Sequence, residues 1–486
     1  MTVRADAPAT PAPAALAALW RHARLPQQAL RHIDLPGSGP VLPSSFAVAT
    51  AAQASLGAAA LAAAEVWHRR TGERQRVQVD ATHAALDSCG WFTLDGKAPN
   101  IWDKLSGLYP CGADTAAPGW VRLHANFAHH RDGALRLLGC APGDATGREA
   151  VAQALRTWRA EDFETAAAEA GLVVAAARDF ATWDRHPQGL ALAQAPAVRI
   201  ERIADAPPAA PRAWPALTAQ ASPLAGLRVL DLTRILAGPV AGRTLAAYGA
   251  DVMLLNAPHL PNIAAIADTS RGKRSAHVDL KTEAGRETLR ALLATSHVFL
   301  QGYRPGGLQA LGFGPEETAR LRPGIVHVSL SAYGAQGPWA SRRGFDSLVQ
   351  TATGFNLAEA AACGARQPQA MPMQILDYAA GYLLAFGAQA ALLRQQDEGG
   401  SWHVQVSLAG VGRWLRSLGR VPQGFEVQRP PFEPYLEVSD SGFGRLVALR
   451  HAAQFSRTPA RWQHPSMPPG THAARWPEFD AARRTE

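Results

Sequence analysis

Apolar residues in the second half of the chain form short continuous runs that alternate with helix-like stretches. The runs LRVLDLT (227–233), ADVMLL (250–255), SHVFLQ (296–301) and GIVHVSL (324–330) each have the length of a strand. Continuous apolar strands separated by helices are typical of a parallel sheet that is covered on both faces. We therefore predict an α/β fold with a Rossmann-like parallel sheet, which binds ligands at the carboxyl ends of its strands.

Two distant segments share one pattern of elements. Residues 58–86 and residues 386–415 both contain an Ala/Leu-rich helix, a polar turn with glycine, the strand VQVD or VQVS, and a further helix. The copies lie too far apart in the chain to be neighbouring units of a solenoid. One connecting element has therefore been used twice.

Proline marks the main boundary in the chain. The segment PPAAPRAWPALTAQASP, Pro207 to Pro223, has the composition of a linker because repeated proline blocks helix formation and favours extended chain. We expect an Ala/Pro-rich segment (1–40), a first folded region (41–206), the linker (207–223), a large domain (224–420), and a Pro/Trp/Arg-rich segment that wraps over the large domain as irregular chain (421–486).

Composition excludes several classes of function. The net charge of +8 would attract polyanions, but the chain has no long Lys/Arg block, zinc-finger spacing or aromatic RNA-binding signature, so we expect no nucleic-acid partner. The cysteines Cys89, Cys111, Cys140 and Cys363 show no CxxC spacing and indicate isolated thiols in a reducing compartment. The N-terminal residues do not resemble a secretory signal, and the most apolar runs stop short of the about 18–20 residues of a membrane span. We expect a cytoplasmic protein without a membrane partner.

A nicotinamide site is not indicated. RILAGPVAG follows the first strand and supplies Gly238, Pro239 and Gly242, but not the G-x-G-x-x-G spacing, and the second strand ends in Asn256 where such a site needs an acidic residue. Hydride transfer and a redox cofactor are therefore disfavoured.

The segment HANFAHHRD brings three histidines, His124, His129 and His130, close together in the sequence. They could bind a metal, but no acidic residue or cysteine has a matching spacing. We favour solvated or hydrogen-bonded histidines and expect no metal site. The chain also lacks the G-x-S-x-G elbow of an α/β-hydrolase.

The segment SRGKRSAHVDLK concentrates Arg271, Lys273 and Arg274 beside a glycine. Such a loop can hold phosphate groups through charge-assisted hydrogen bonds. From the residues alone, a solvated loop is slightly favoured.

Asp377 is the carboxylate of MQILDYAAG, a segment that begins a long Ala/Leu/Gly-rich helix pattern. It could cap the helix by accepting backbone N–H bonds. It could also be a nucleophile that attacks an activated acyl carbon. The residues alone do not separate these two interpretations.

Several motifs in order resemble the large domain of the family III CoA transferases. They are PLAGLRVLDLTRILAGPVAGRTLAAYGADV, RGKRSAHVDLKTEAGRETL, RPGGLQALGFGPE, RPGIVHVSLSAYGAQGP, RRGFDSLVQTATGF and ILDYAAGYLLAFGAQAALL, within residues 222–418. The N-terminal half resembles the small α+β domain of the same family, from SGLYPCGADTAAPGW to ALAQAPAVRIERI. The small domain would then have moved to the front of the chain with its connecting element duplicated, which accounts for the repeat.

The resemblance implies a chemical role for Asp377. Its carboxylate would attack an acyl-CoA thioester and form a mixed anhydride, which CoA converts into an aspartyl-CoA thioester before a free carboxylic acid takes over the CoA. The chemistry needs coenzyme A as substrate and neither a metal nor a redox cofactor. The family also implies an interlocked homodimer; the acyl donor and acceptor stay open.

The resemblance further implies a binding site. CoA contacts would involve Leu236, Ala237, Arg271, Lys273, Arg274, Arg304, Tyr333 and Gly334, and the acyl pocket would contain Phe345 and Asp346. Asn256, Gly302 and Ala310 replace residues that are usual in the family, so the alternative is a catalytically silent CoA-binding or interaction protein. An α-methylacyl-CoA racemase ranks lower, because racemases have His where this chain has Phe345, and Phe cannot exchange a proton.

Overall fold

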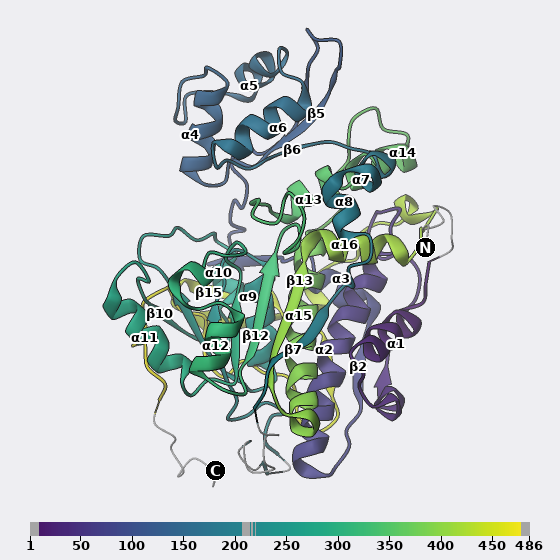
Figure 1. Ribbon diagram of the computed structural model, residues 1–486. Coiled ribbons are helices and arrows are strands. Elements are labelled where there is room, and N and C mark those ends of the chain that lie inside the picture. Colours follow the sequence, from purple (N-terminus) through teal and green to yellow (C-terminus); the bar gives the residue numbers. More distant parts are fainter. Residues whose placement is uncertain (1–8, 207–213, 215–216, 219, 478–486) are drawn as a thin grey trace.

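The computed structural model describes residues 9–206, 214, 217–218 and 220–477, and its centre is a parallel sheet (Figure 1). Within these residues the largest sheet has seven strands in the order β10-β9-β8-β11-β12-β13-β7. The strands are β7 (Arg199–Ala204), β8 (Arg228–Leu232), β9 (Asp251–Asn256), β10 (Lys273–His277), β11 (Val298–Gln301), β12 (Val326–Ser331) and β13 (Ser401–Ser407). Neighbouring strands run parallel except for β7, which pairs antiparallel with β13 at the edge. The predicted α/β class is confirmed.

Helices cover both faces of this sheet, and alternate side chains of β8 show how. Val229 belongs to the large core under α9 and α15, whereas Leu230 and Leu232 face a second core with α11 and α12. The two faces are apolar because successive side chains of a strand point to opposite sides. The helices are α9 (Ala237–Ala247), α10 (Ile266–Thr269), α11 (Glu283–Leu293), α12 (Pro315–Leu321), α13 (Asp346–Ala352), α14 (Phe355–Cys363), α15 (Ile375–Glu398) and α16 (Leu408–Ser417).

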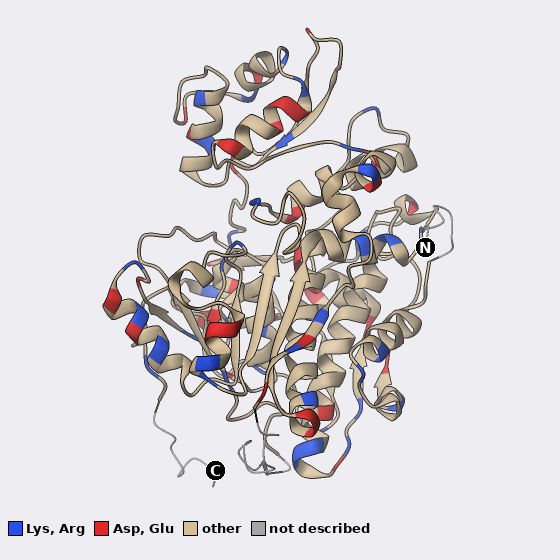
Figure 2. Ribbon diagram, viewed as in Figure 1, with Lys and Arg blue, Asp and Glu red and all other residues tan. Residues whose placement is uncertain are grey.

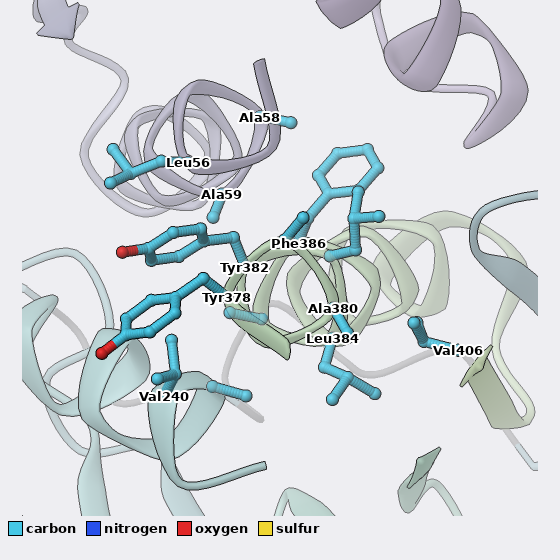
Figure 3. Packing of buried hydrophobic residues seen from close by; sticks show 14 of the residues in the cluster. Leu56, Ala58, Ala59, Val240, Tyr378, Ala380, Tyr382, Leu384, Phe386 and Val406 are labelled. Carbon is cyan, nitrogen blue, oxygen red and sulfur yellow. The ribbon is translucent and has the colours of Figure 1, made fainter. Parts of the chain in front are cut away.

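Helix α15 is the centre of the main core. It lies between α9 and the N-terminal helix α2 (Val48–Thr71), and its residues Tyr378, Tyr382 and Phe386 pack among their side chains (Figure 3). Among the described residues α15 alone is long and apolar enough to cross a membrane, and its most apolar window is wholly buried inside the protein. Burial on all sides explains why the helix has almost no polar face.

The N-terminal half divides differently from our expectation. A small unit at the top of Figure 1 consists of β4 (Gly107–Cys111), β5 (Gly119–Leu123), β6 (Val174–Ala176), α4 (Ala128–Leu137), α5 (Arg148–Leu155) and α6 (Ala160–Glu169), and has its own apolar core. The elements before it, α1 (Ala12–His22), β1 (Ile33–Asp34), α2, β2 (Val77–Val79), α3 (Ala81–Asp87) and β3 (Phe92–Leu94), belong to the main body. After it come α7 (Phe180–Arg185), α8 (Pro187–Leu192) and the edge strand β7. Residues 41–206 are therefore not one domain.

The C-terminal segment contains strands where we expected irregular chain. β14 (Leu436–Ser441) and β15 (Gly444–Leu449) form a hairpin, and β15 also pairs with β3. β16 (Ala453–Phe455) pairs with β2. The frequent Pro and Arg residues around these short strands obscure the apolar pattern that would predict them. Backbone hydrogen bonds join these C-terminal strands to β2 and β3 in the N-terminal half. Most of the predicted linker lies outside the described residues.

Charged residues follow the outside of the molecule. Figure 2 shows them on outer helices such as α11, whereas β12, β13 and most of α15 carry none. The charged side chains that are buried therefore stand out, among them Asp231, Lys273, Asp346 and Asp377.

Candidate active site

Asp377 lies in the first turn of α15, the central helix of the core. The helix begins at Ile375 and Gln374 is its N-cap, so the interpretation of Asp377 as the capping residue is wrong. Its side chain is 8% exposed. One turn later, a Cβ atom at Gly381 would lie 2.6 Å from the carbonyl oxygen of Ala237, so this glycine lets α15 pack directly on the start of α9.

A second carboxyl group lies beside the first. Asp346 begins α13 and is fully buried. Its Oδ2 accepts a 2.9 Å hydrogen bond from the backbone N–H of Asp377, and its Oδ1 accepts one of 2.5 Å from Nε2 of Gln350. These bonds hold the side chain of Asp346 against the first turn of α15.

Burial raises the pKa of both carboxyl groups. For Asp346 it raises the pKa to about 7, against the hydrogen bonds from Asp377 and Gln350 and the positive charge of Arg122. For Asp377, burial raises the pKa well above its usual value, and the negative charge of Asp346 adds to this. Two neighbouring buried carboxyl groups do not both ionise readily, so the pair retains a proton near neutral pH. The remaining carboxylate is poorly solvated, which increases its reactivity.

A side chain of the small N-terminal unit packs against Phe345, the residue that precedes Asp346. Phe345, next to Asp346, stacks on His124 with ring centroids 4.1 Å apart and planes inclined by 16°. His124 follows β5, is 5% exposed, and its Nδ1 has no hydrogen-bond partner among the described residues. Burial is the main reason why its pKa falls to about 3, so the ring is neutral near pH 7. His124 is therefore buried and stacked rather than solvated.

A cavity of about 380 Å³, here called the switch-point cavity, opens at the carboxyl ends of β8, β11 and β12. Leu232, Gly302, Ser331 and Phe345 are among its walls. In the sheet β8 lies between β9 and β11, so the chain changes direction at this point, and such positions commonly bind ligands in α/β proteins.

The walls of the switch-point cavity are strongly basic. They include Arg234, Arg304, Arg342, Arg343, His129 and His130, and none of the residues that line the cavity is acidic. Nη1 of Arg343 lies 3.4 Å from Nε2 of His130, and burial lowers the pKa of His130 to about 4. The arginine charges therefore dominate, and the cavity suits an anionic ligand such as a phosphate or carboxylate.

Strained backbone borders the same cavity. Ile235, between β8 and α9, has φ of 78°, a region that β-branched residues rarely occupy. Such strain costs on the order of 1–3 kcal/mol and is found at binding and catalytic sites more often than elsewhere. The loop that joins β8 to α9 is thus held in one defined shape at the cavity wall.

Two of the basic residues that the sequence suggested for CoA binding, Arg271 and Lys273, are buried and form ion pairs within the protein. Nζ of Lys273 is fully buried and donates 2.8 Å hydrogen bonds to Oδ2 of Asp231 and to the carbonyl oxygen of Pro239. Arg271 pairs with Asp268 and donates to Oε1 of Glu437 at 2.8 Å. Neither side chain lines the switch-point cavity.

The other expected contacts are dispersed around the sheet. Leu236 and Ala237 form the junction of the strained loop with α9, and Arg304 lines the cavity as expected. Arg274, by contrast, lies on β10 and is only half-buried. Tyr333 and Gly334 lie on the α8 side of the sheet: the ring of Tyr333 packs against Trp183 and Trp339, and Gly334 contacts Leu192.

Sequence reasoning assigned to the binding site only Arg304 of the six basic side chains of the switch-point cavity; it did not name Arg234, Arg342 or Arg343, and it considered His129 and His130 only as metal ligands or as solvated or hydrogen-bonded side chains. Arg234 directly follows a strand, and the two arginines precede the GFD motif. The position of Arg234 just after a strand was the signal that could have placed it at the binding edge of the sheet. His130 could not be assigned in this way, because it reaches the cavity only through the docking of the small unit.

Comparison with known proteins agrees with this geometry. Residues 224–418 match the family model described as CoA-transferase family III. A probable fatty acyl-CoA transferase of Mycobacterium tuberculosis is 36% identical over 211 residues, which cover 40% of this chain and 53% of that protein. A succinate–glutarate CoA-transferase of Agrobacterium fabrum is 31% identical over 48% of this chain and 65% of its own.

Longer and structural matches extend the comparison. An acyl-CoA transferase of Gibberella moniliformis is 29% identical over 412 residues, 77% of this chain and 71% of that protein. A crystal structure of the Mycobacterium tuberculosis protein aligns at 37% identity over 41% of this chain and 58% of that chain, with a TM-score of 0.37. The chain spans about half the length of the first curated relative that it matches. The similarity to CoA-transferase family III lies in residues 224–418 of this chain.

Proposed function

We propose that this protein is a CoA transferase that moves CoA from an acyl-CoA thioester to a free carboxylic acid, with Asp377 as the nucleophile. The observation that carries the proposal is the pair of buried carboxyl groups of Asp377 and Asp346, the latter directly following Phe345, a wall residue of the basic cavity at the switch point of the sheet. An ionised carboxylate in apolar surroundings is a good nucleophile toward a thioester carbonyl.

The reaction proceeds through covalent intermediates on Asp377. Its carboxylate oxygen attacks the thioester carbon, the C–S bond breaks, and the CoA thiolate departs. The product on the protein is an acyl-aspartyl anhydride. The thiolate then attacks the aspartyl carbonyl carbon, which releases the donor acid and forms an aspartyl-CoA thioester. The acceptor carboxylate attacks the carbonyl carbon of this thioester, the C–S bond breaks, and an acceptor-aspartyl anhydride and free CoA thiolate result. The thiolate finally attacks the acceptor acyl carbon, which forms the new acyl-CoA and releases the carboxylate of Asp377. No electrons are exchanged and no proton is consumed overall.

The other residues bind and position in this scheme. Arg234, Arg304 and Arg343 hold the anionic groups of CoA, in place of the buried Arg271 and Lys273. Asp346 anchors the first turn of α15 through the backbone N–H of Asp377 and shares the proton of the pair. Phe345 offers no exchangeable proton to the acyl α-carbon, so transfer is favoured over racemisation. A homodimer and a cytoplasmic location stay predictions from the sequence.

Intact mass spectrometry tests the nucleophile. Wild type, Asp377→Asn and the matched control Asp397→Asn, at the far end of the same helix, are incubated with short-chain and medium-chain acyl-CoA thioesters and quenched in acid. We expect an acyl or CoA adduct on the wild type and on Asp397→Asn, and none on Asp377→Asn. CoA binding by calorimetry without any adduct would favour the catalytically silent protein instead.

A further inference from the structure

The internal repeat is a repeat of structure as well as of sequence. Helices α2 and α15 both contain 24 residues and both end at a glycine, Gly72 and Gly399. The shift along the chain that superposes these helices also brings β2 (Val77–Val79) onto residues 404–406 of β13. It brings the capping hydrogen bond of α3, from His83 N–H to Asp80, onto that of α16, from Gly410 N–H to Ser407.

The two copies pack side by side and run in the same direction. Arg69 near the end of α2 forms an ion pair at 2.9 Å with Asp397 near the end of α15. Nε2 of Gln389 donates to the carbonyl oxygen of Ala59 at 3.1 Å in the middle of the pair, and Figure 3 shows the adjacent helices. The first turns of α2 and α15 therefore lie at the same end of the helix pair.

The same shift places Thr50 at the position of Asp377. The first turn of α2 contains no acidic residue, whereas that of α15 contains Asp377. The first copy thus keeps the helix and loses the nucleophile. A hydroxyl group in place of a carboxylate cannot form the anhydride, but it can donate a hydrogen bond to a ligand.

A large cavity opens beside Thr50. Its volume is about 710 Å³. The walls are mainly apolar and include Leu35, Val41, Leu42, Phe46, Val48 and Val421. The polar side chains on the walls include Thr50, Gln53 and Arg420. Both N–H donors of the Gln53 amide serve the protein itself, since Nε2 donates to the carbonyl oxygens of Pro36 and Val79.

The walls of this cavity lack the acidic groups of the carboxyl pair. The guanidinium group of Arg420 lies 4.0 Å above the ring of Phe46 and donates a 2.7 Å hydrogen bond to Oγ of Ser45. None of the residues that line the cavity is acidic. The same Ser45 Oγ donates to the buried carboxylate of Glu359 at 2.7 Å, so the charge of Arg420 is already shared within the protein. A carboxylate in the cavity therefore meets the hydroxyl group of Thr50 on a wall without acidic residues, whereas at Asp377 it meets two acidic groups.

We propose that this cavity, here called the Thr50 cavity, is a second, non-catalytic site that binds a fatty acid, with the alkyl chain on the apolar wall and the carboxylate at the hydroxyl group of Thr50. The class of ligand rests on the proposed function, because the first copy inherits the position of an acyl-binding site. The site holds a carboxylic acid without covalent reaction.

The test uses decanoate and the full-length protein in isothermal titration calorimetry. Ser38→Trp places an indole at the exposed edge of the Thr50 cavity, and Thr50→Val removes the hydroxyl group at nearly constant volume. Thr71→Val, at the other end of the same helix, is the matched control. All are compared in the Asp377→Asn background, so that a failure of the transferase chemistry does not affect the result.

We expect decanoate to bind Asp377→Asn and the Thr71→Val control equally. Thr50→Val should weaken binding roughly tenfold to a hundredfold, the range for a lost hydrogen bond to a charged group, and Ser38→Trp should abolish it. Equal binding by all variants, or no binding by any, overturns the proposal. Binding to the wild type that is lost in Asp377→Asn but kept when Ser38→Trp is introduced alone into the wild type overturns it as well, and assigns the fatty acid to the carboxyl pair.

Discussion

The backbone N–H of Asp377 donates a 2.9 Å hydrogen bond to Oδ2 of Asp346, so one buried carboxyl group anchors the helix that carries the other. This contact fixes the first turn of α15 against Asp346, whose neighbour Phe345 lines the switch-point cavity. It also couples the ionisation of the two groups, because a charge on Asp346 raises the pKa of Asp377. The position of Asp377 and the stability of the protein therefore depend on the same pair.

Asp377→Asn should stabilise the protein, and increasingly so as the pH rises. Both carboxyl groups have a pKa raised above the unfolded value of 3.8. In the wild type the folded state binds more protons, so its stability is greatest below about pH 4 and falls until the pH passes the folded pKa, about 7 for Asp346. Asp377→Asn removes the contribution of Asp377 to this fall in stability. For one carboxyl group that contribution is up to about 1.4 kcal/mol per pH unit.

Urea unfolding of the wild type and the variant at several pH values between 4 and 8 measures this difference. Asp397→Asn, which changes an exposed carboxylate of the same helix, should follow the wild type at each pH. A stability difference that is the same at pH 4 and pH 8 would contradict the raised pKa values of the pair.

Arg304→Ala and Arg343→Ala should each weaken acyl-CoA binding. A charge-assisted hydrogen bond contributes about 1.5–3 kcal/mol, so we expect KM to rise roughly tenfold to a hundredfold with a smaller change in kcat. Steady-state kinetics at low and high salt measures the effect, which should diminish as salt screens the charges. Arg320→Ala, whose side chain is 70% exposed on α12, is the control and should leave KM unchanged. Unchanged KM in both cavity variants would place CoA elsewhere.

The contrast between Arg304 and Lys273 shows how far the sequence could lead. The strand pattern predicts the parallel sheet, and residues near strand ends, such as Arg304, then fall at the binding edge. Lys273 lies in a basic Gly-containing segment that looks like a phosphate loop, yet it begins a strand that pairs with β9. Only the folded sheet brings it to Asp231, because no local pattern encodes a charge pair between distant strands. For a related reason the sequence named His124 only as a metal candidate or a solvated or hydrogen-bonded histidine, since its stacking on Phe345 arises only when the small unit packs against the main body.

Lys273→Met should destabilise the protein strongly. Removing one partner of a buried ion pair leaves Asp231 charged and unpaired in the core, at a cost of about 3–5 kcal/mol. The double variant Asp231→Leu/Lys273→Met should recover much of this loss, because neither charge is then left alone. Urea unfolding measures both, and Lys281→Met on the surface is the control. If Lys273→Met instead keeps wild-type stability and raises the KM for acyl-CoA, Lys273 contacts the substrate as the sequence suggested.

His124→Phe should keep the wall of the active site and stabilise the protein slightly. The substitution retains an aromatic ring against Phe345 and removes the buried Nδ1 that has no partner among the described residues, a change worth roughly 1 kcal/mol. His124→Ala should instead lose the stacking and leave a hole, at a cost of about 1–3 kcal/mol, and should lower kcat as Phe345 shifts. Thermal unfolding and steady-state kinetics of both variants separate two roles for His124. If its function is packing, His124→Phe has the kcat and KM of the wild type; a loss of kcat/KM in His124→Phe that matches that of His124→Ala would show that the imidazole nitrogen itself contacts the acyl group.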